Sequence, residues 1–282
     1  MNVVEVNNVS FRYPIGKEKV LENISFNIEQ GEFVAIVGAN GSGKTTLCNI
    51  LRGFIPKFHN GCDFIGTVMI EGKNIADMTM GELAKKVGFV FQDPFIQISG
   101  IKKTVFEEVA FGLENLGTPR DEMKIRVEKI IDTLKISDLK DKHPAELSGG
   151  QRQRVALASV LVMEPNILII DEPTSQLDPI GTEEVFDIIK LMKEKNKTII
   201  LVEHKIDLIS EYADRVILLN GKKIKFDNTV ENILSNERIL NYGVNLPEVT
   251  QLAIKYEKET NKELEYIPVN IDGAKKLFKN IK

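Results

Sequence analysis

The most informative segment of this sequence is Leu147-Ser148-Gly149-Gly150-Gln151. Upstream, residues 38–45 read Gly-Ala-Asn-Gly-Ser-Gly-Lys-Thr, which fits the phosphate-loop pattern G-x-x-x-x-G-K-[ST]. Downstream, the apolar run 167–170 ends in Asp171 and Glu172. Chance would supply the loop pattern in about one chain of this length in a hundred, and the pentapeptide in roughly less than one in a thousand. The three stretches in this order leave little room for coincidence.

Composition limits the class of protein. The chain has 282 residues, of which 43% are apolar and 28% charged, and a net charge of −4. These are ordinary values for a globular protein of one large or two modest domains. Nucleic-acid binders are usually strongly basic, so we expect no nucleic-acid partner. Cys48 and Cys62 lack metal-ligand spacing, which favours a reducing, cytosolic compartment. We expect no signal peptide and no apolar run of the roughly 20 residues that span a bilayer.

Hydrophobic patterns predict an α/β chain. Alternation from Val4 to Tyr13 predicts half-buried strands, and the apolar run 33–37 predicts a buried parallel strand that leads through the phosphate loop into a helix from Thr45 to Leu51. From about Phe95 to Pro144 apolar residues recur at helical spacing, which predicts a helical insert. Further strands are expected over 67–70, 87–91, 167–170 and 198–202, helices over 151–163 and 183–195, and a hairpin of 216–219 with 222–226 that turns at Asn220-Gly221.

The tail after about Leu240 carries two short amphipathic segments. Pro247 can open a first helix, and Asp272 can N-cap a second. Helices this short need a surface on which to bury their apolar faces. That surface is either the chain's own core or a second molecule. The apolar residues are Val249, Leu252, Ala253 and Tyr256 in the first segment and Ala274, Leu277, Phe278 and Ile281 in the second.

The order of these motifs resembles the ATP-binding cassette (ABC) ATPases, the motor subunits of ABC transporters. The resemblance implies a P-loop α/β fold with a RecA-like core sheet, an antiparallel β subdomain, a helical insert and a small α-rich C-terminal extension. It also implies a nucleotide-binding domain over residues 1–238, with the insert at about 95–160. The extension over 239–282 is then a candidate for dimerisation.

A phosphate loop predicts ATP and Mg²⁺ as ligands. Its glycines let backbone N–H groups surround phosphate oxygens, and the following helix N-terminus attracts anions. Lys44 is expected to reach the β- and γ-phosphates, and Thr45, Gln92 and Asp171 to hold Mg²⁺ directly or through water. The residues expected to bind nucleotide are Tyr13, Gly38, Asn40, Gly41, Ser42, Gly43, Lys44, Thr45, Thr46, Ser148, Gly149, Gly150 and Gln151.

The resemblance implies three catalytic residues. Glu172 matches the family's catalytic carboxylate, which acts as base or orienter for the attacking water. Gln92 matches the Q-loop, which contacts Mg²⁺ or that water, and His204 matches the switch histidine that contacts the γ-phosphate. The alternatives for these residues taken singly are an N-capping acid, a polar strand end and a surface histidine.

Tyr13 stands in Phe11-Arg12-Tyr13-Pro14, where the resembled family places an aromatic ring that stacks on adenine. An aromatic residue that simply packs beside a proline is the open alternative.

Residues 148–150 precede a helix expected to start near Gln151, so they form a second phosphate site. In the resembled family this half-site serves the ATP of a partner subunit, with two cassettes head to tail and two ATP molecules between them. The resemblance therefore implies a dimer, homo or hetero. The segment 175–178, Ser-Gln-Leu-Asp, matches the D-loop that crosses that interface, although alanine is more usual at Gln176.

Segments 92–94, 104–117 and 246–252 resemble the ATPase (A) subunits of energy-coupling factor (ECF) importers, which include cobalt- and nickel-type systems. The loop 98–103 is longer than the commoner form. The resemblance implies a second ABC ATPase subunit, a transmembrane T subunit and a substrate-binding S subunit as partners, and a peripheral place on the cytoplasmic face of the membrane. It also favours a tail that contacts the other ATPase. Because the S subunit selects the cargo, a vitamin, a vitamin precursor and a transition-metal ion all stay open.

Two other functions compete with the importer. Soluble ABC ATPases of DNA repair or translation usually have a long coiled coil or two cassettes in one chain, and often basic surfaces, none of which this sequence shows. A regulatory cassette without hydrolysis would tend to lose Glu172, His204 or the signature pentapeptide, and all three are intact. The sequence therefore favours the importer ATPase.

Overall fold

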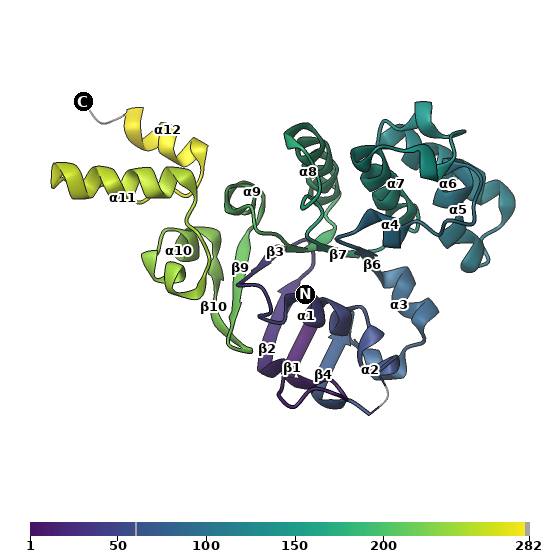
Figure 1. Cartoon of the computed structure of the whole chain (residues 1–282), viewed down its shortest axis with the longest axis horizontal. Helices are drawn as coiled ribbons and strands as arrows, with labels where there is room; N and C mark the ends of the chain where they lie inside the picture. Colours follow the sequence, from purple (N-terminus) through teal and green to yellow (C-terminus); the bar gives the residue numbers. More distant parts are fainter. Residues whose placement is uncertain (60, 280–282) are drawn as a thin grey trace.

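The computed structural model describes residues 1–59 and 61–279, which form two β-sheets with helices around them (Figure 1). The smaller sheet is antiparallel, with strand order β2-β1-β4-β5. The larger, with order β10-β9-β3-β8-β7-β6, is parallel except for β10 at its edge. The strands are β1 (Asn2–Arg12), β2 (Leu21–Glu29), β3 (Phe33–Val37), β4 (Asp63–Ile70), β5 (Lys73–Asn74), β6 (Val87–Val90), β7 (Ile167–Asp171), β8 (Thr198–Val202), β9 (Arg215–Asn220) and β10 (Lys223–Thr229).

Helices cover both faces of the larger sheet, and those between β6 and β7 form a separate lobe (Figure 1). None of the described helices is long and apolar enough to cross a membrane. The α-helices are α1 (Lys44–Leu51), α2 (Phe54–Lys57), α3 (Met80–Lys86), α4 (Pro94–Gln97), α5 (Val105–Asn115), α6 (Arg120–Thr133), α7 (Gly149–Leu161), α8 (Pro179–Glu194), α9 (Ile206–Tyr212), α10 (Val230–Leu234), α11 (Glu248–Thr260) and α12 (Ile271–Lys279).

Three hydrophobic clusters hold the layers together. In the first, Leu47 and Leu51 of α1 pack between the two sheets. In the second, Val155 of α7 and Phe186 of α8 pack on the opposite face of the larger sheet. The architecture confirms the predicted α/β fold, with its core sheet, antiparallel subdomain and helical insert.

Several predicted bounds are wrong by a few residues. The strand expected over 67–70 begins at Asp63, and the strand expected over 87–91 ends at Val90. The helix expected from Glu183 begins at Pro179. It does so because the Asp178 carboxylate accepts a hydrogen bond from the N–H of Gly181 at 2.7 Å, and because proline suits the first helical position.

One predicted turn and one predicted helix cap are also corrected. The hairpin between β9 and β10 turns at Gly221 and Lys222, whose φ angles are 54° and 71°. Positive φ at both central residues is the type I′ geometry that fits the twist of the strands. In the tail, the N-cap of α12 is Asn270, since its Oδ1 accepts from the N–H of Gly273 at 2.8 Å, whereas Asp272 lies in the first turn.

The tail packs partly on the chain's own core. Val244, Leu246 and Val269 join α9 and β9 in the third cluster, and the N–H of Glu248 donates to Asp207 of α9 at 2.9 Å. Among the residues predicted to share one face, Ala253 is fully buried. Leu252 is 60% exposed, so part of the predicted apolar face is left uncovered by the described residues. Ile281, predicted for the second tail helix, lies outside the described residues.

Candidate functional site

The phosphate loop connects the carboxyl end of β3 to α1, and two of its glycines are required by geometry. Gly38 has φ of 151°, and a Cβ there would lie 2.1 Å from the carbonyl oxygen of Leu219. Gly43 has φ of 104°, and a Cβ there would lie 2.7 Å from Leu21. Side chains at these positions would therefore strain the backbone and collide with β9 or β2. The tip of the loop, Asn40 and Gly41, is exposed.

Lys44 lies over the loop that it follows. Its Nζ donates to the carbonyl oxygens of Gly38 at 2.9 Å and Ala39 at 3.3 Å, and the residue is only 5% exposed. Burial lowers the pKa of Lys44, while the nearby carboxylates of Glu172 and Asp171 act to raise it. A buried ammonium group with only carbonyl partners is suited to an incoming anion.

Asp171 ends β7, and its surroundings suit a hard cation. Burial raises the pKa of its carboxyl, and a hydrogen bond from Thr45 acts in the opposite direction. Its Oδ1 is buried and has no hydrogen-bond partner among the described residues. The same holds for the Oγ of Ser42 in the phosphate loop. The Asp171 carboxylate and the Thr45 hydroxyl beside it match the oxygen ligands that Mg²⁺ prefers. The described residues contain no cluster of three His, Cys, Asp or Glu that could hold a metal ion.

The three residues predicted to be catalytic meet at Glu172. Its Oε1 lies 2.9 Å from Nε2 of His204, and its Oε2 accepts from Nε2 of Gln92 at 2.7 Å. Gln92 follows β6, Glu172 follows β7 and His204 follows β8, so neighbouring parallel strands bring them to one edge of the sheet. Glu172 has φ of 47°, which is unusual for a residue with a side chain and recurs at functional sites.

The signature residues begin α7 in a capping box. The Oγ of Ser148 accepts from the N–H of Gln151 at 3.4 Å, and Oε1 of Gln151 accepts from the N–H of Ser148 at 3.1 Å. The helix therefore begins at Gly149, two residues before the predicted start. A Cβ on Gly149 or Gly150 would meet nothing within 4 Å, so the space beside both glycines is open.

Figure 1 places α7 in the helical lobe and α1 between the sheets, so the signature is not part of the phosphate-loop site of the same chain. The D-loop segment 175–178 follows Glu172 closely, and Ser175 and Gln176 are exposed.

Tyr13 follows β1 and is half-buried beside the phosphate-loop helix. Its hydroxyl lies 3.1 Å from Oγ1 of Thr46 in α1. Its ring packs edge-on against Phe11 and His59, with centroid distances of 4.7 and 5.4 Å. The alternative of simple aromatic packing is thus present in the structure, and stacking on adenine stays a prediction.

Two residues near the site, Arg52 and Glu203, were not among those predicted from the sequence. Arg52, at the end of α1, lies 4.2–4.9 Å from the ring centroids of Phe54, Phe89 and Phe91. Glu203, next to the switch histidine, is buried and accepts three hydrogen bonds. Neither belongs to a short motif, and both depend on contacts between distant segments.

Comparison with known proteins gives consistent results. The family model described as "ABC transporter" matches residues 21–175. A putative ABC transporter ATP-binding protein of Pyrococcus horikoshii is 47% identical over 91% of this chain and 89% of its own. The energy-coupling factor transporter ATP-binding protein EcfA1 of Lacticaseibacillus paracasei is 41% identical over 87% of this chain and 86% of its own. The solved structure of CbiO1 from Clostridium perfringens, part of the ABC transporter complex cbiONQ, superposes with a TM-score of 0.74 and 33% identity over 89% of this chain and 98% of its own.

Proposed function

Because the chain belongs to the ABC transporter family of ATP-binding proteins, we propose that it is the ATPase subunit of an ECF-type importer for a vitamin, a vitamin precursor or a transition-metal ion. It is an ABC ATPase that hydrolyses ATP to drive transport. The ECF assignment is supported by similarity to EcfA1 and CbiO1 over most of the chain. In this proposal the nucleotide-binding domain spans 1–238, and the extension spans 239–282.

Hydrolysis is carried by the Glu172 carboxylate, which Gln92 and His204 hold from two sides. Glu172 orients the attacking water and accepts its proton. His204 contacts the γ-phosphate, and Lys44 stabilises the charge on the β- and γ-phosphates. Thr45, Gln92 and Asp171 hold Mg²⁺, which neutralises charge on the transferring phosphoryl group when it is bound.

A second cassette completes the site. The N-terminal end of α7 lies in the helical lobe, apart from the phosphate loop of its own chain, and a Cβ on Gly149 or Gly150 would meet nothing within 4 Å. A helix N-terminus of this kind attracts anions. In a head-to-tail pair this end binds the γ-phosphate of the ATP held by the partner. The exposed D-loop segment 175–178 lies in the same interface. The partner cassette is either a second copy or a related ATPase.

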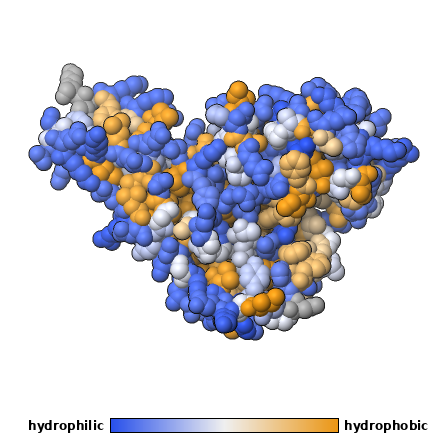
Figure 2. All heavy atoms as spheres, viewed as in Figure 1, coloured by the Kyte–Doolittle hydropathy of each residue, from blue (hydrophilic) through white to orange (hydrophobic). Residues whose placement is uncertain are grey.

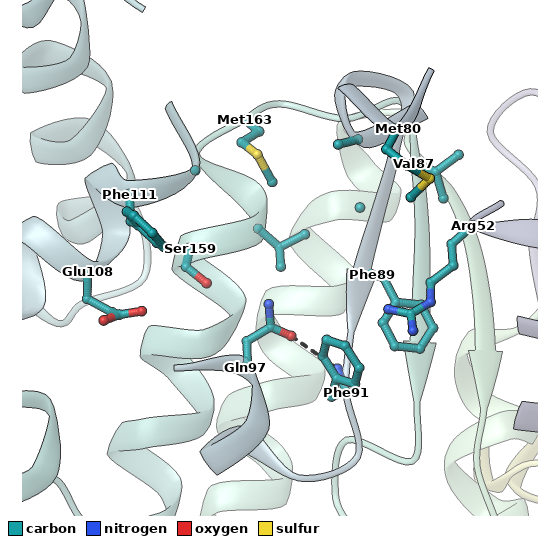
Figure 3. A pocket seen from close by; sticks show the side chains of 14 residues that line it. Arg52, Met80, Val87, Phe89, Phe91, Gln97, Glu108, Phe111, Ser159 and Met163 are labelled. Atoms are coloured by element: carbon teal, nitrogen blue, oxygen red, sulfur yellow. Dashed lines mark hydrogen bonds between the residues drawn. The ribbon is translucent and has the colours of Figure 1, made fainter. Parts of the chain in front are cut away.

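A groove between the helical lobe and the core sheet is the docking site for the transmembrane T subunit. Its cavity has a volume of about 270 Å³ (Figure 3). At one end Arg52 lies against Phe89, and at the other lie Phe111 and the carboxylate of Glu108 (Figure 3). Gln97 accepts from the N–H of Phe91 at 3.3 Å, which ties the segment after Gln92 to this groove. A helix seated here would sense movements of the Q-loop. The chain then lies on the cytoplasmic face of the membrane.

Purification from native membranes tests the proposed function. We expect a tag on this chain to recover a second cassette and a polytopic membrane protein in stoichiometric amounts, together with a small membrane-embedded S subunit whose bound ligand identifies the cargo. Recovery of the chain with DNA-repair or ribosomal components, and without a membrane protein, would contradict the importer and favour the soluble alternative.

Adenine is expected to stack on Tyr13. Tyr13→Ala should raise the dissociation constant for ATP about tenfold, because a lost base–aromatic stack costs about 1–3 kcal/mol. Turnover at saturating ATP should change little, since stacking contributes equally to the ground and transition states. Titration with a fluorescent ATP analogue measures the affinity. Tyr13→Phe keeps the ring and loses only the contact with Thr46, so an equal loss in both variants would exclude stacking.

The tail is proposed to hold the two ATPases together when ATP is absent. Its exposed apolar residues include Leu252 on α11 and Ile271 on α12, which are 60% and 61% exposed. In Figure 2 the C-terminal extension, at the upper left, carries hydrophobic side chains among the hydrophilic ones. Truncation before Leu240 would also remove Val244 and Leu246 from the chain's own core, so point substitutions separate the two effects.

Leu252→Lys is expected to weaken the nucleotide-free pair about tenfold or more, because burial of a leucine contributes about 1.5–3 kcal/mol. Sedimentation equilibrium without ATP measures the association. Ile125→Lys is the matched control, since Ile125 is 66% exposed on α6 in the helical lobe. Equal association of the Leu252→Lys variant and the control would exclude the tail contact.

A further inference from the structure

Glu203 is a buried carboxylate between the end of β8 and the switch histidine. It is 3% exposed, and within the described residues it has no ion-pair partner. Its Oε1 accepts from the N–H groups of His204 at 2.8 Å and Lys205 at 3.2 Å, and its Oε2 accepts from the hydroxyl of Thr174 at 2.8 Å. A buried carboxylate is tolerated only when its oxygens are so satisfied. One side chain therefore connects the backbone of residues 204–205 with Thr174, which follows β7.

Thr174 connects this side chain to the dimer interface. It is 1% exposed and stands directly before the D-loop segment 175–178, two residues after Glu172. Pro173 before it is buried as well, whereas Ser175 and Gln176 after it are exposed. The hydrogen bond from Thr174 therefore connects the start of the D-loop segment with Glu203.

Together the hydrogen bonds close a circuit. Glu172 contacts the ring of His204, the backbone of His204 donates to Glu203, and Glu203 accepts from Thr174, which returns to Glu172 through the chain. The peptide N–H of Glu172 also donates to the carbonyl oxygen of Val202 at 2.8 Å. This bond joins the ends of β7 and β8. These contacts link the backbone and the ring of His204 to Glu203, Thr174 and Glu172.

We propose that Glu203 is a positioning residue that couples the D-loop to the switch histidine. When a partner cassette fixes segment 175–178, Thr174 and Glu203 hold the backbone of His204 in the position in which its ring contacts Glu172. Hydrolysis then proceeds at full rate only in the assembled pair. This inference rests on the proposed catalytic roles of Glu172 and His204.

Kinetics of the complete ATPase complex test the coupling. Glu203→Ala leaves the hydroxyl of Thr174 and two backbone N–H groups without their acceptor, so kcat is expected to fall about tenfold through misplacement of His204. KM for ATP should change less than twofold, since Glu203 does not touch the nucleotide-binding loop. Glu203→Gln is expected to restore most of kcat, because its carbonyl accepts from the N–H groups and its amide donates to the Thr174 hydroxyl.

A double-mutant cycle shows whether Thr174 and Glu203 act together. Thr174→Val keeps the buried volume and removes the hydroxyl, and it should lower kcat severalfold in the wild type. In the Glu203→Ala background it should add almost nothing, because the contact is already lost. Independent, multiplicative losses would overturn the coupling even if either single variant folds poorly.

Two controls complete the test. Glu211→Ala removes an exposed glutamate on α9, and its kcat should match the wild type. His204→Ala separates the positioning role of Glu203 from the catalytic role of His204. If His204→Ala lowers kcat while folded Glu203→Ala does not, Glu203 has no positioning role. If His204→Ala itself leaves kcat unchanged, the catalytic assignment fails instead. A Glu203→Ala variant whose KM and melting temperature change along with kcat, with no rescue by glutamine, would show a merely structural role and would also overturn the proposal.

Discussion

Glu172→Gln is expected to lower turnover at saturating ATP about 10²-fold or more, as loss of a positioned general base does. The amide cannot accept the proton of the attacking water. Its shape still fits between Gln92 and His204, which lie 2.7 and 2.9 Å from the two carboxylate oxygens. ATP affinity should stay within a few-fold of the wild type, because Lys44 and the loop N–H groups are unchanged.

The chain offers a matched control for this variant. Glu71 has the same φ of 47° as Glu172, but it contacts Lys86 and Asn166 away from the phosphate loop. Glu71→Gln should therefore keep nearly full turnover. Phosphate release in steady state measures both variants. A Glu172→Gln rate close to the wild type would remove Glu172 from the catalytic step.

Gly149→Asp is expected to lower turnover by a similar factor, about 10²–10³-fold, for a different reason. An aspartate at the signature helix end places negative charge where the partner's γ-phosphate is expected to bind. The chain's own fold should tolerate the change, since a Cβ at Gly149 meets nothing within 4 Å and an acidic residue suits a first helical turn. ATP binding at the phosphate loop of the same chain should persist, because that loop is a separate part of the fold.

Gly81→Asp is the control for the signature substitution. Gly81 lies in the first turn of α3, its Cβ would also meet nothing within 4 Å, and it is exposed. Its turnover and melting temperature should match those of the wild type. A Gly149→Asp variant that binds ATP and hydrolyses it at the rate of the control would show that the signature does not act on a nucleotide.

Local motifs explain what could be predicted from the sequence. The phosphate loop depends on a few glycines with defined backbone angles, so its residues identify its structure. The parallel strands 33–37 and 198–202 were predicted with their observed bounds, because both are continuous apolar runs. Gln92, Glu172 and His204 each end or follow such a strand, and the parallel sheet brings those ends together.

One element that was not predicted, β2, is visible in the sequence, because Ile24, Phe26 and Ile28 alternate with polar residues along it. The other unpredicted features depend on contacts that a single sequence does not display. By contrast, Glu203 and Thr174 are 29 residues apart, and nothing local announces their hydrogen bond. The split of the tail into a buried Ala253 and an exposed Leu252 likewise follows from the position of α11 on the core, which periodicity alone does not determine.

The nucleotide recovered from the Glu172→Gln complex shows whether Glu172 acts in ATP hydrolysis at a site that a second cassette completes. The purified variant would be incubated with Mg²⁺ and excess ATP, separated by size-exclusion chromatography, and its bound nucleotide identified by ion-exchange chromatography. We expect a stable pair of cassettes that retains intact ATP. Recovery of ADP, or of separate cassettes that carry ATP singly, would contradict it.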